Sequence, residues 1–126
     1  MNKQILVIDD DILTLEVINS MLNDEGYNVK SVHLTEMIFP SIAEFNPDLI
    51  IMDIKLNKAD GRILCNQIKE SENTKHIPII LLTGLDYDLI GEIICNADAI
   101  MGKPYKLDNM LLTIKNLLDS KIETFS

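Results

Sequence analysis

The feature of this sequence that most limits its possible folds is an alternation of short apolar runs with longer amphipathic segments. The runs of strand length lie at about residues 4–9, 27–32, 49–53, 78–83 and 98–101. Segments with helical spacing of apolar residues follow them, at about 11–25, 34–45, 61–71, 86–95 and 107–120. Strands and helices that alternate in this way form a parallel sheet with helices on both faces. We therefore expect an α/β fold with a (βα)5, doubly wound, five-stranded parallel sheet.

Apolar spacing predicts which faces of the first and last helices are buried. The predicted buried residues are Ile12, Leu15, Ile18 and Leu22 in the first helix, and Leu107, Leu111, Ile114 and Leu118 in the last. Asp11 and Asp60 precede helices and are expected to cap them, because an aspartate there accepts hydrogen bonds from first-turn N–H groups. Residues 54–60 are expected to form a loop.

Pro40 lies in the middle of the second predicted helix. Proline removes a helix hydrogen bond and clashes with the preceding turn. The helix therefore either kinks at Pro40 or starts late, with Pro40 in its first turn. The sequence leaves both possibilities open.

The charge of this chain disfavours some classes of partner. Its 126 residues are enough for one domain, and they carry a formal net charge of −9. Phosphate backbones and anionic membranes repel an acidic surface, so we expect no direct binding to nucleic acid or to a membrane. A divalent cation or a basic protein surface is compatible with this charge, although a solvated acidic surface explains most of it.

The cysteines and the N-terminus indicate a compartment. Cys65 and Cys95 lie in apolar helical surroundings without CxxC pairing, so we expect buried free thiols in a reducing environment. No apolar run approaches the roughly 18 residues of a membrane span. An aspartate cluster at residues 9–11 is incompatible with a signal peptide. We therefore expect a cytoplasmic protein.

Polar residues suited to phosphoryl chemistry stand at the ends of four predicted strands. These residues are Asp9 and Asp10, Asp53, Thr83 and Lys103. In the flavodoxin-like strand order 2-1-3-4-5, the carboxyl ends of the strands gather at one edge of the sheet, where ligands bind. Clustered carboxylates repel one another, and a divalent cation relieves that repulsion. Mg²⁺ suits such oxygen ligands, and Mn²⁺ would fit similar ones. The alternative is that the first aspartates merely cap a helix.

Lys103 is followed by Pro104, which bears on where the lysine points. A cis peptide is much commoner at an X–Pro bond than elsewhere, and such a turn would aim the lysine over the strand ends. Its ammonium would then pair with Asp53 or with a phosphoryl oxygen. Taken alone, Lys103-Pro104 would be an ordinary surface turn, and Thr83 an ordinary strand-end threonine.

Several short motifs follow one another in a characteristic order. They are Leu6-Val-Ile-Asp-Asp10, Pro47-Asp-Leu-Ile-Ile-Met-Asp53, Asp60-Gly61, Ile79-Ile-Leu-Leu-Thr-Gly84, Ala97-Asp-Ala99 and Lys103-Pro104. Over about residues 3–120 the sequence resembles the receiver domain of two-component response regulators, in particular chemotaxis-regulator-like proteins. The resemblance implies a receiver domain over 1–120 and a C-terminal tail, 121–126, that we expect to be frayed.

The resemblance implies roles in phosphoryl transfer for three residues. Asp53 would accept a phosphoryl group from a sensor histidine kinase, a phosphotransfer protein or a small-molecule donor. Lys103 would contact a phosphoryl oxygen. Thr83 would move its hydroxyl onto the phosphoryl group and report the modified state.

The resemblance also implies a set of metal ligands. Asp10 would bind Mg²⁺ directly, and Asp9 mainly through water. Asp53 and the backbone carbonyl of Lys55 would supply the other protein ligands.

The leading hypothesis is therefore a stand-alone phosphoacceptor switch rather than an enzyme. It would signal to an unknown downstream protein, as a monomer or as a phosphorylation-dependent dimer. One alternative is the receiver portion of a longer regulator or hybrid kinase. Another is a pseudo-receiver that acts without phosphorylation, because Ile100 stands where the family usually has an aromatic residue. A haloacid-dehalogenase-like phosphatase is disfavoured, because Asp53 is followed by Ile54-Lys55 and not by a second aspartate two residues on.

Overall fold

The computed structural model describes residues 2–84 and 95–123, with the backbone alone for 121–123. Its strands are β1 (Gln4–Ile8), β2 (Asn28–Val32), β3 (Leu49–Asp53), β4 (Lys55–Leu56), β5 (Ala59–Asp60), β6 (Ile79–Thr83) and β7 (Ala99–Gly102). Its helices are α1 (Ile12–Asp24), the 3₁₀ helix η1 (Thr35–Met37), α2 (Ile38–Phe45), α3 (Gly61–Glu70) and α5 (Leu107–Glu123). None of the helices in these ranges is long and apolar enough to cross a membrane.

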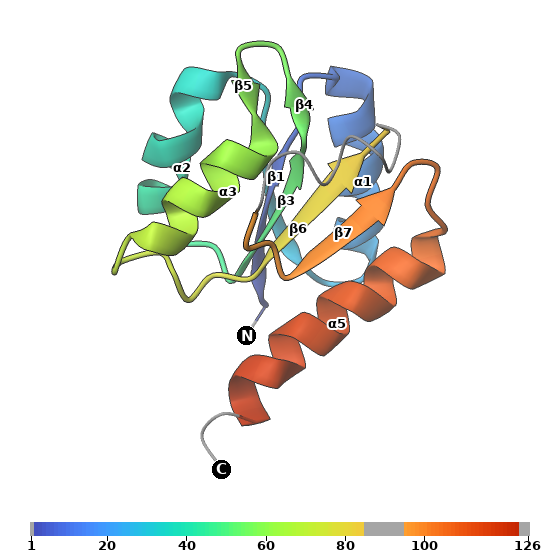
Figure 1. The fold of residues 1–126 in the computed structure, drawn as a ribbon. Coiled ribbons are helices and arrows are strands. Elements are labelled where there is room, and N and C mark those ends of the chain that lie inside the picture. Colours follow the sequence, from blue (N-terminus) through green and yellow to red (C-terminus); the bar gives the residue numbers. More distant parts are fainter. Residues whose placement is uncertain (1, 85–94, 124–126) are drawn as a thin grey trace.

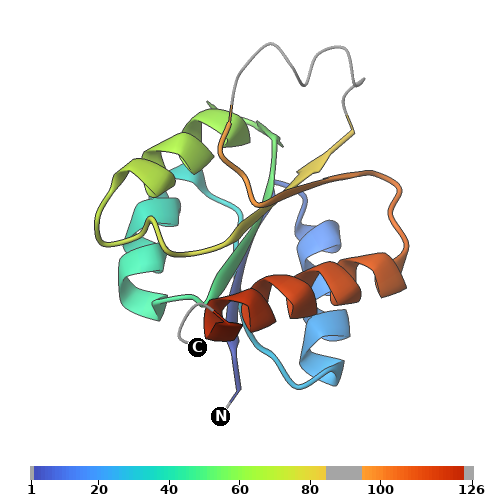
Figure 2. The same cartoon turned by 60° about the horizontal axis from the view of Figure 1, so that its bottom comes forward.

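The main sheet has five strands in the order β2-β1-β3-β6-β7, and every neighbouring pair is parallel. This confirms the predicted doubly wound order. Helices α2 and α3 lie on one side of the sheet, and α1 and α5 lie on the other (Figures 1 and 2). Because the five strands of the main sheet are parallel, their carboxyl ends all lie at one edge, which is the edge that carries the polar residues.

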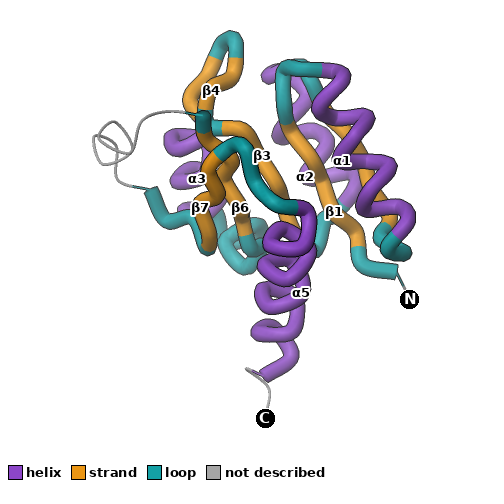
Figure 3. The backbone as a smooth tube through the Cα atoms, turned by 90° about the vertical axis from the view of Figure 1, so that its right-hand side faces the viewer, coloured by secondary structure: helices purple, strands orange, loops and turns teal. Residues whose placement is uncertain are grey.

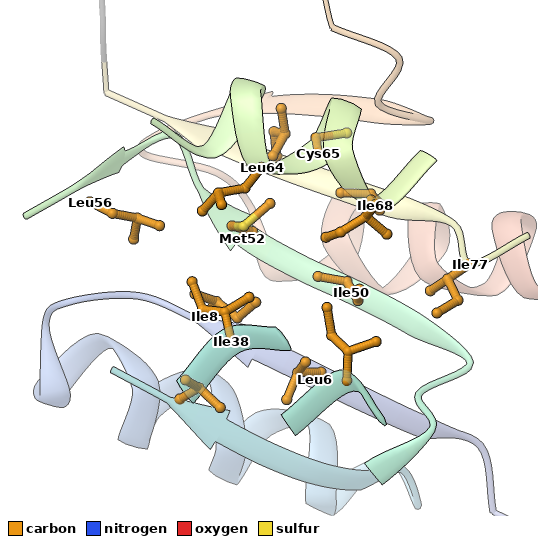
Figure 4. Close-up of a cluster of buried hydrophobic side chains, with 14 of the residues drawn as sticks. Leu6, Ile8, Ile38, Ile50, Met52, Leu56, Leu64, Cys65, Ile68 and Ile77 are labelled. Atoms are coloured by element: carbon orange, nitrogen blue, oxygen red, sulfur yellow. The ribbon is translucent and has the colours of Figure 1, made fainter. Parts of the chain in front are cut away.

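The core consists of two apolar layers, one on each face of the sheet. Successive side chains of a strand point to opposite faces. Leu6 and Ile8 therefore pack toward α2 and α3, whereas Ile5 and Val7 pack toward α1 and α5. Figure 4 shows the first layer, with Ile50 between side chains of β1 and α3. Because the central strands are covered on both faces, they are apolar at nearly every position.

The structure resolves how the helices begin. Asp11 accepts a hydrogen bond from the Leu13 N–H, and Asp60 accepts one from the Arg62 N–H, which confirms both predicted caps. Helix α2 starts late, at Ile38, and Pro40 lies in its first turn. Proline is tolerated there because the first N–H groups of a helix have no partner within the helix.

Several local predictions were wrong. The predicted loop over 54–60 contains the two-stranded β4–β5 hairpin. This hairpin lies at the end of the molecule opposite the start of β1 and the C-terminal end of α5 (Figures 1 and 3). Helix α5 continues to Glu123, beyond its predicted end at about residue 120. The helix predicted at 86–95 falls almost entirely outside the described residues.

The predicted buried faces also need correction. Helix α5 buries Met110, Ile114 and Leu118, while Leu107 is 39% exposed. Of the predicted residues, Ile114 and Leu118 are buried and Leu111 is partly buried in the same layer, so the error lies at Leu107 and in the omission of Met110. In α1, Ile12 is 54% exposed, because this first helical residue lies beyond the part of α1 that packs on the sheet.

Cys65 is buried, whereas Cys95 is only partly buried, and both are free thiols.

Candidate functional site

The predicted site residues lie at the carboxyl ends of adjacent strands. Asp9 follows β1, Asp53 is the last residue of β3, and Ile8 of β1 pairs with Met52 of β3. Thr83 is the last residue of β6 and pairs with Gly102 of β7, which precedes Lys103. The Lys103 N–H donates to the Thr83 carbonyl at 2.7 Å. The sheet thus brings residues from four strands to one edge.

The Lys103 ammonium lies between two carboxylates. Its Nζ atom is 3.4 Å from Asp9 Oδ2 and 3.5 Å from Asp53 Oδ2. The Lys103–Pro104 peptide bond is cis, as the sequence suggested. Sequence reasoning foresaw the pair with Asp53 but missed the pair with Asp9. No local signal indicates that second pair, because the two residues are 94 positions apart.

Burial and neighbouring charges together shift the pKa values of Asp53 and Lys103. The side chains of Asp9 and Asp53 are 4% and 13% exposed. Burial raises the pKa of Asp53, the neighbouring Asp9 raises it further, and Lys103 offsets part of the rise. Burial alone would lower the pKa of Lys103, but Asp53 and Asp9 outweigh that effect and raise it. An ammonium with a raised pKa stays charged at neutral pH, so it can hold anionic oxygen atoms.

The remaining predicted site residues occupy the same end of the molecule. Asp10 follows Asp9 in the chain and is partly exposed. Thr83 is 2% exposed at the end of β6. Lys55 opens the hairpin, and its backbone pairs with that of Asp60.

The donor set at this edge has the chemistry of a hard cation site. Over residues 2–84 and 95–123, no group of three or more His, Cys, Asp or Glu side chains is close enough to hold a metal ion. The two carboxylates that share the Lys103 ammonium are, however, oxygen donors in a mostly buried place. Mg²⁺ is usually held by one or two carboxylates together with water and phosphate oxygens. Asp9 and Asp53 therefore fit Mg²⁺, and Asp10 is next to Asp9 in the chain.

The parallel sheet of this order, with aspartates at the carboxyl ends of β1 and β3 and a lysine after β7, defines a flavodoxin-like α/β protein. The family model described as the response regulator receiver domain matches residues 5–115, so this chain belongs to that family. The resemblance stated from the sequence is thereby confirmed.

Relatives and solved structures agree with this assignment. The DNA-binding dual master transcriptional regulator RpaA of Synechocystis is 32% identical over 117 residues, which are 91% of this chain and 48% of RpaA. A response regulator receiver domain protein from Methanospirillum hungatei has a TM-score of 0.88 at 26% identity, covering 98% of this chain and 99% of that one. The receiver domain of a sensor histidine kinase from Pseudomonas aeruginosa, with a magnesium ion coordinated in its active-site cleft, has a TM-score of 0.83 at 26% identity, covering 94% and 99%. The chain spans about half the length of the curated relatives it matches.

The raised pKa of Asp53 predicts an unusual dependence of stability on pH. The ordinary value is 3.8, and the folded value lies above it. The stability that Asp53 contributes is therefore present below pH 3.8 and is lost as the pH rises through the folded pKa. Relative to the native chain, Asp53→Asn should become more stable as the pH rises through this window. Urea unfolding with a chelator present, from about pH 3 to about pH 7, measures the difference.

Asp60→Asn serves as a control, because its effect on stability should change with pH in the opposite direction. The hydrogen bonds from Arg62 hold the pKa of Asp60 below 3.8. The stability that Asp60 contributes is present above pH 3.8 and is lost as the pH falls through the folded pKa. This variant should be less stable than the native chain at neutral pH, and the difference in unfolding free energy should disappear in acid. The same pH trend in both variants would contradict the assignment.

Proposed function

We propose that this chain is a phosphoacceptor switch of a two-component system, with Asp53 as the residue that is phosphorylated. A histidine kinase or a phosphotransfer protein would be the donor, and a small acyl phosphate would be able to replace it. The observation that carries the proposal is the mostly buried Asp53 carboxylate, 3.5 Å from the Lys103 ammonium at the carboxyl edge of the sheet. A carboxylate so placed combines nucleophilic oxygen atoms with a cation ready to neutralise added charge.

In this proposal the residues of the chain mainly position the phosphoryl group and neutralise its charge. An Asp53 oxygen would form a bond to phosphorus while the bond between phosphorus and the donor atom breaks. Phosphoryl transfer depends on position and charge stabilisation more than on covalent machinery. Lys103 would hold an oxygen of the transferred group, and the hydroxyl of Thr83 would approach it afterwards.

The proposed metal ligands are Asp9, Asp10, Asp53 and the carbonyl of Lys55. Mg²⁺ would supply charge neutralisation at the phosphoryl oxygens, and Mn²⁺ would fit the same oxygen donors. The similar Pseudomonas receiver domain with its coordinated magnesium supports this part of the proposal.

Phosphorylation would act as a switch by changing local charge. It adds about −1.5 to −2 charges at neutral pH, beside two carboxylates that already share one ammonium. The conformational equilibrium would then shift toward the state that best accommodates the new charge. We propose that a cytoplasmic protein partner reads this state, without direct contact to nucleic acid, and that the chain is a monomer or a phosphorylation-dependent dimer.

Two other roles remain candidates, each with an observation behind it. The match to about half of the relatives' length supports the receiver portion, residues 1–120, of a longer regulator or hybrid kinase. A pseudo-receiver that acts without phosphorylation is supported by Ile100, which is 40% exposed on β7 where the family usually has an aromatic residue.

Intact mass after incubation with acetyl phosphate and Mg²⁺ tests the proposal. We expect one added phosphoryl group on the native chain, dependent on Mg²⁺ and absent from Asp53→Asn. Asp119→Asn is the matched control, because it makes the same change at an exposed carboxylate on α5, outside the proposed ligand set. Labelling of Asp53→Asn would move the acceptor to another residue. If neither acetyl phosphate nor a cognate kinase labels the folded native chain, the pseudo-receiver role replaces the switch.

A further inference from the structure

Gly61, the first residue of α3, touches the backbone that carries Asp53. Its N–H donates to the Ile54 carbonyl at 2.7 Å. A Cβ atom placed on Gly61 would overlap the main-chain oxygen of Asp53, and it would lie 3.0 Å from the Ile54 Cα and 3.2 Å from the Asp53 carbonyl carbon. These are main-chain atoms, so no side-chain rotation relieves the overlap.

Glycine is required at position 61 because there is no room for a side chain, and not because of its backbone conformation. Among the described glycines, positive φ occurs at Gly26 and not at Gly61. Any L-residue could therefore adopt the Gly61 backbone, but none could fit beside Asp53 without moving it. Sequence reasoning treated Asp60-Gly61 as a helix start and as one of the motifs of the family resemblance, and it missed this contact.

Residues 60–62, the Gly61 segment, are held by hydrogen bonds to one another and to the hairpin. Asp60 accepts from the Arg62 N–H at 2.8 Å, and its two carboxylate oxygens accept from Arg62 Nε at 3.0 Å and from Nη2 at 2.7 Å. Arg62 is 7% exposed. The backbone of Asp60 also pairs with Lys55 across the hairpin. A side chain at residue 61 would overlap the Asp53–Ile54 backbone, so these two stretches of main chain would have to move apart to accommodate it.

We propose that Gly61 is a positioning residue for phosphoryl transfer. Its lack of a side chain sets where the Asp53 carboxylate and the Lys55 carbonyl lie relative to Lys103. The two groups flank Ile54, whose carbonyl accepts the Gly61 hydrogen bond. This inference rests on the proposed function, because it assumes that Asp53 is the acceptor and that the Lys55 carbonyl is a metal ligand.

The test compares Gly61→Ala with Leu118→Ala. In the metal-free protein, Gly61→Ala should shift the backbone amide NMR signals of residues 53–55. It should slow phosphorylation by acetyl phosphate at saturating Mg²⁺ by about 10- to 100-fold, since misplacement by about 1 Å has effects of this size. It should also raise the Mg²⁺ concentration for half-maximal rate. Leu118→Ala weakens the core on the other face of the sheet. It should lower the unfolding midpoint while it leaves the amide signals of residues 53–55 and the Mg²⁺ dependence as in the native chain.

The possible outcomes separate this inference from the proposed function. Equal rates and Mg²⁺ dependence in the native chain and Gly61→Ala would overturn the inference alone. An effect of Leu118→Ala on the Mg²⁺ dependence as large as that of Gly61→Ala would overturn it too, because loss of stability would then explain both. No phosphorylation of the native chain would overturn the proposed function, and the inference with it.

A second variant covers the case in which Gly61→Ala does not fold. Asp60→Ala removes the carboxylate that holds Arg62, so it frees the Gly61 segment without inserting an atom near Asp53. It should slow phosphorylation and raise the Mg²⁺ requirement in the same direction. A native rate and a native Mg²⁺ dependence in this variant would overturn the inference.

Discussion

Replacing Lys103 by methionine is expected to slow phosphorylation by acetyl phosphate about 10²- to 10³-fold, the usual cost of removing one preorganised charge stabiliser. Methionine keeps the apolar stem and removes the ammonium that lies 3.4 Å from Asp9 and 3.5 Å from Asp53. The negative charge that develops on the phosphoryl oxygens would then meet two carboxylates without that cation. The initial rate of mass increase at saturating Mg²⁺ measures the effect.

Lys115→Met is the matched control for this prediction. Lys115 is exposed on α5, so the same chemical change there removes one positive charge far from the strand ends. The control should be phosphorylated at the native rate. A rate for Lys103→Met within threefold of that control would contradict the role proposed for the ammonium. A second expectation is that the pKa of Asp53 rises further in Lys103→Met, because Lys103 lowers it in the native chain.

Replacing Ile50 by alanine is expected to have the largest effect on stability. Ile50 is 0% exposed in β3, the middle strand of the sheet, and it packs in the layer under α2 and α3 (Figure 4). Removing three buried carbons leaves a cavity and costs about 2–5 kcal/mol of unfolding free energy. That is a large part of the roughly 5–15 kcal/mol that stabilises a typical domain. The thermal midpoint should fall by roughly 10 °C.

Ile63→Ala makes the same change on the exposed surface. Ile63 is 48% exposed on α3, so its substitution should alter the unfolding free energy by no more than about 0.5 kcal/mol. Urea unfolding of both variants, followed by circular dichroism, gives the comparison. Equal loss in the two variants would mean that the Ile50 layer is not the tightly packed core described above.

The strands and their polar ends could be predicted from the sequence because their cause is local. A strand covered on both faces must be apolar at almost every position, so a run such as Leu49–Met52 indicates a buried strand. A polar residue at the end of such a run lies at the edge of a parallel sheet whichever helices cover it. Asp9, Asp53, Thr83 and Lys103 could therefore be named, and placed at one edge, before any tertiary contact was known.

The details that set the site's chemistry depend on contacts that tertiary packing makes. The pair between Lys103 and Asp9 requires β7 and β1 to hold fixed positions on either side of β3 and β6. Packing against the sheet also decides that Met110 of α5 is buried while Leu107 is 39% exposed.

Sequence by itself thus determined the strand order, the edge and the residue types of the candidate site. Tertiary structure alone decided that Asp53 is mostly buried beside Asp9, and that Gly61 lies too close to the Asp53 backbone for a side chain to fit. The physical reason is separation along the sequence. Periodicity and strand ends depend on neighbouring residues, whereas burial, pKa shifts and close contacts arise between distant residues that only folding brings together.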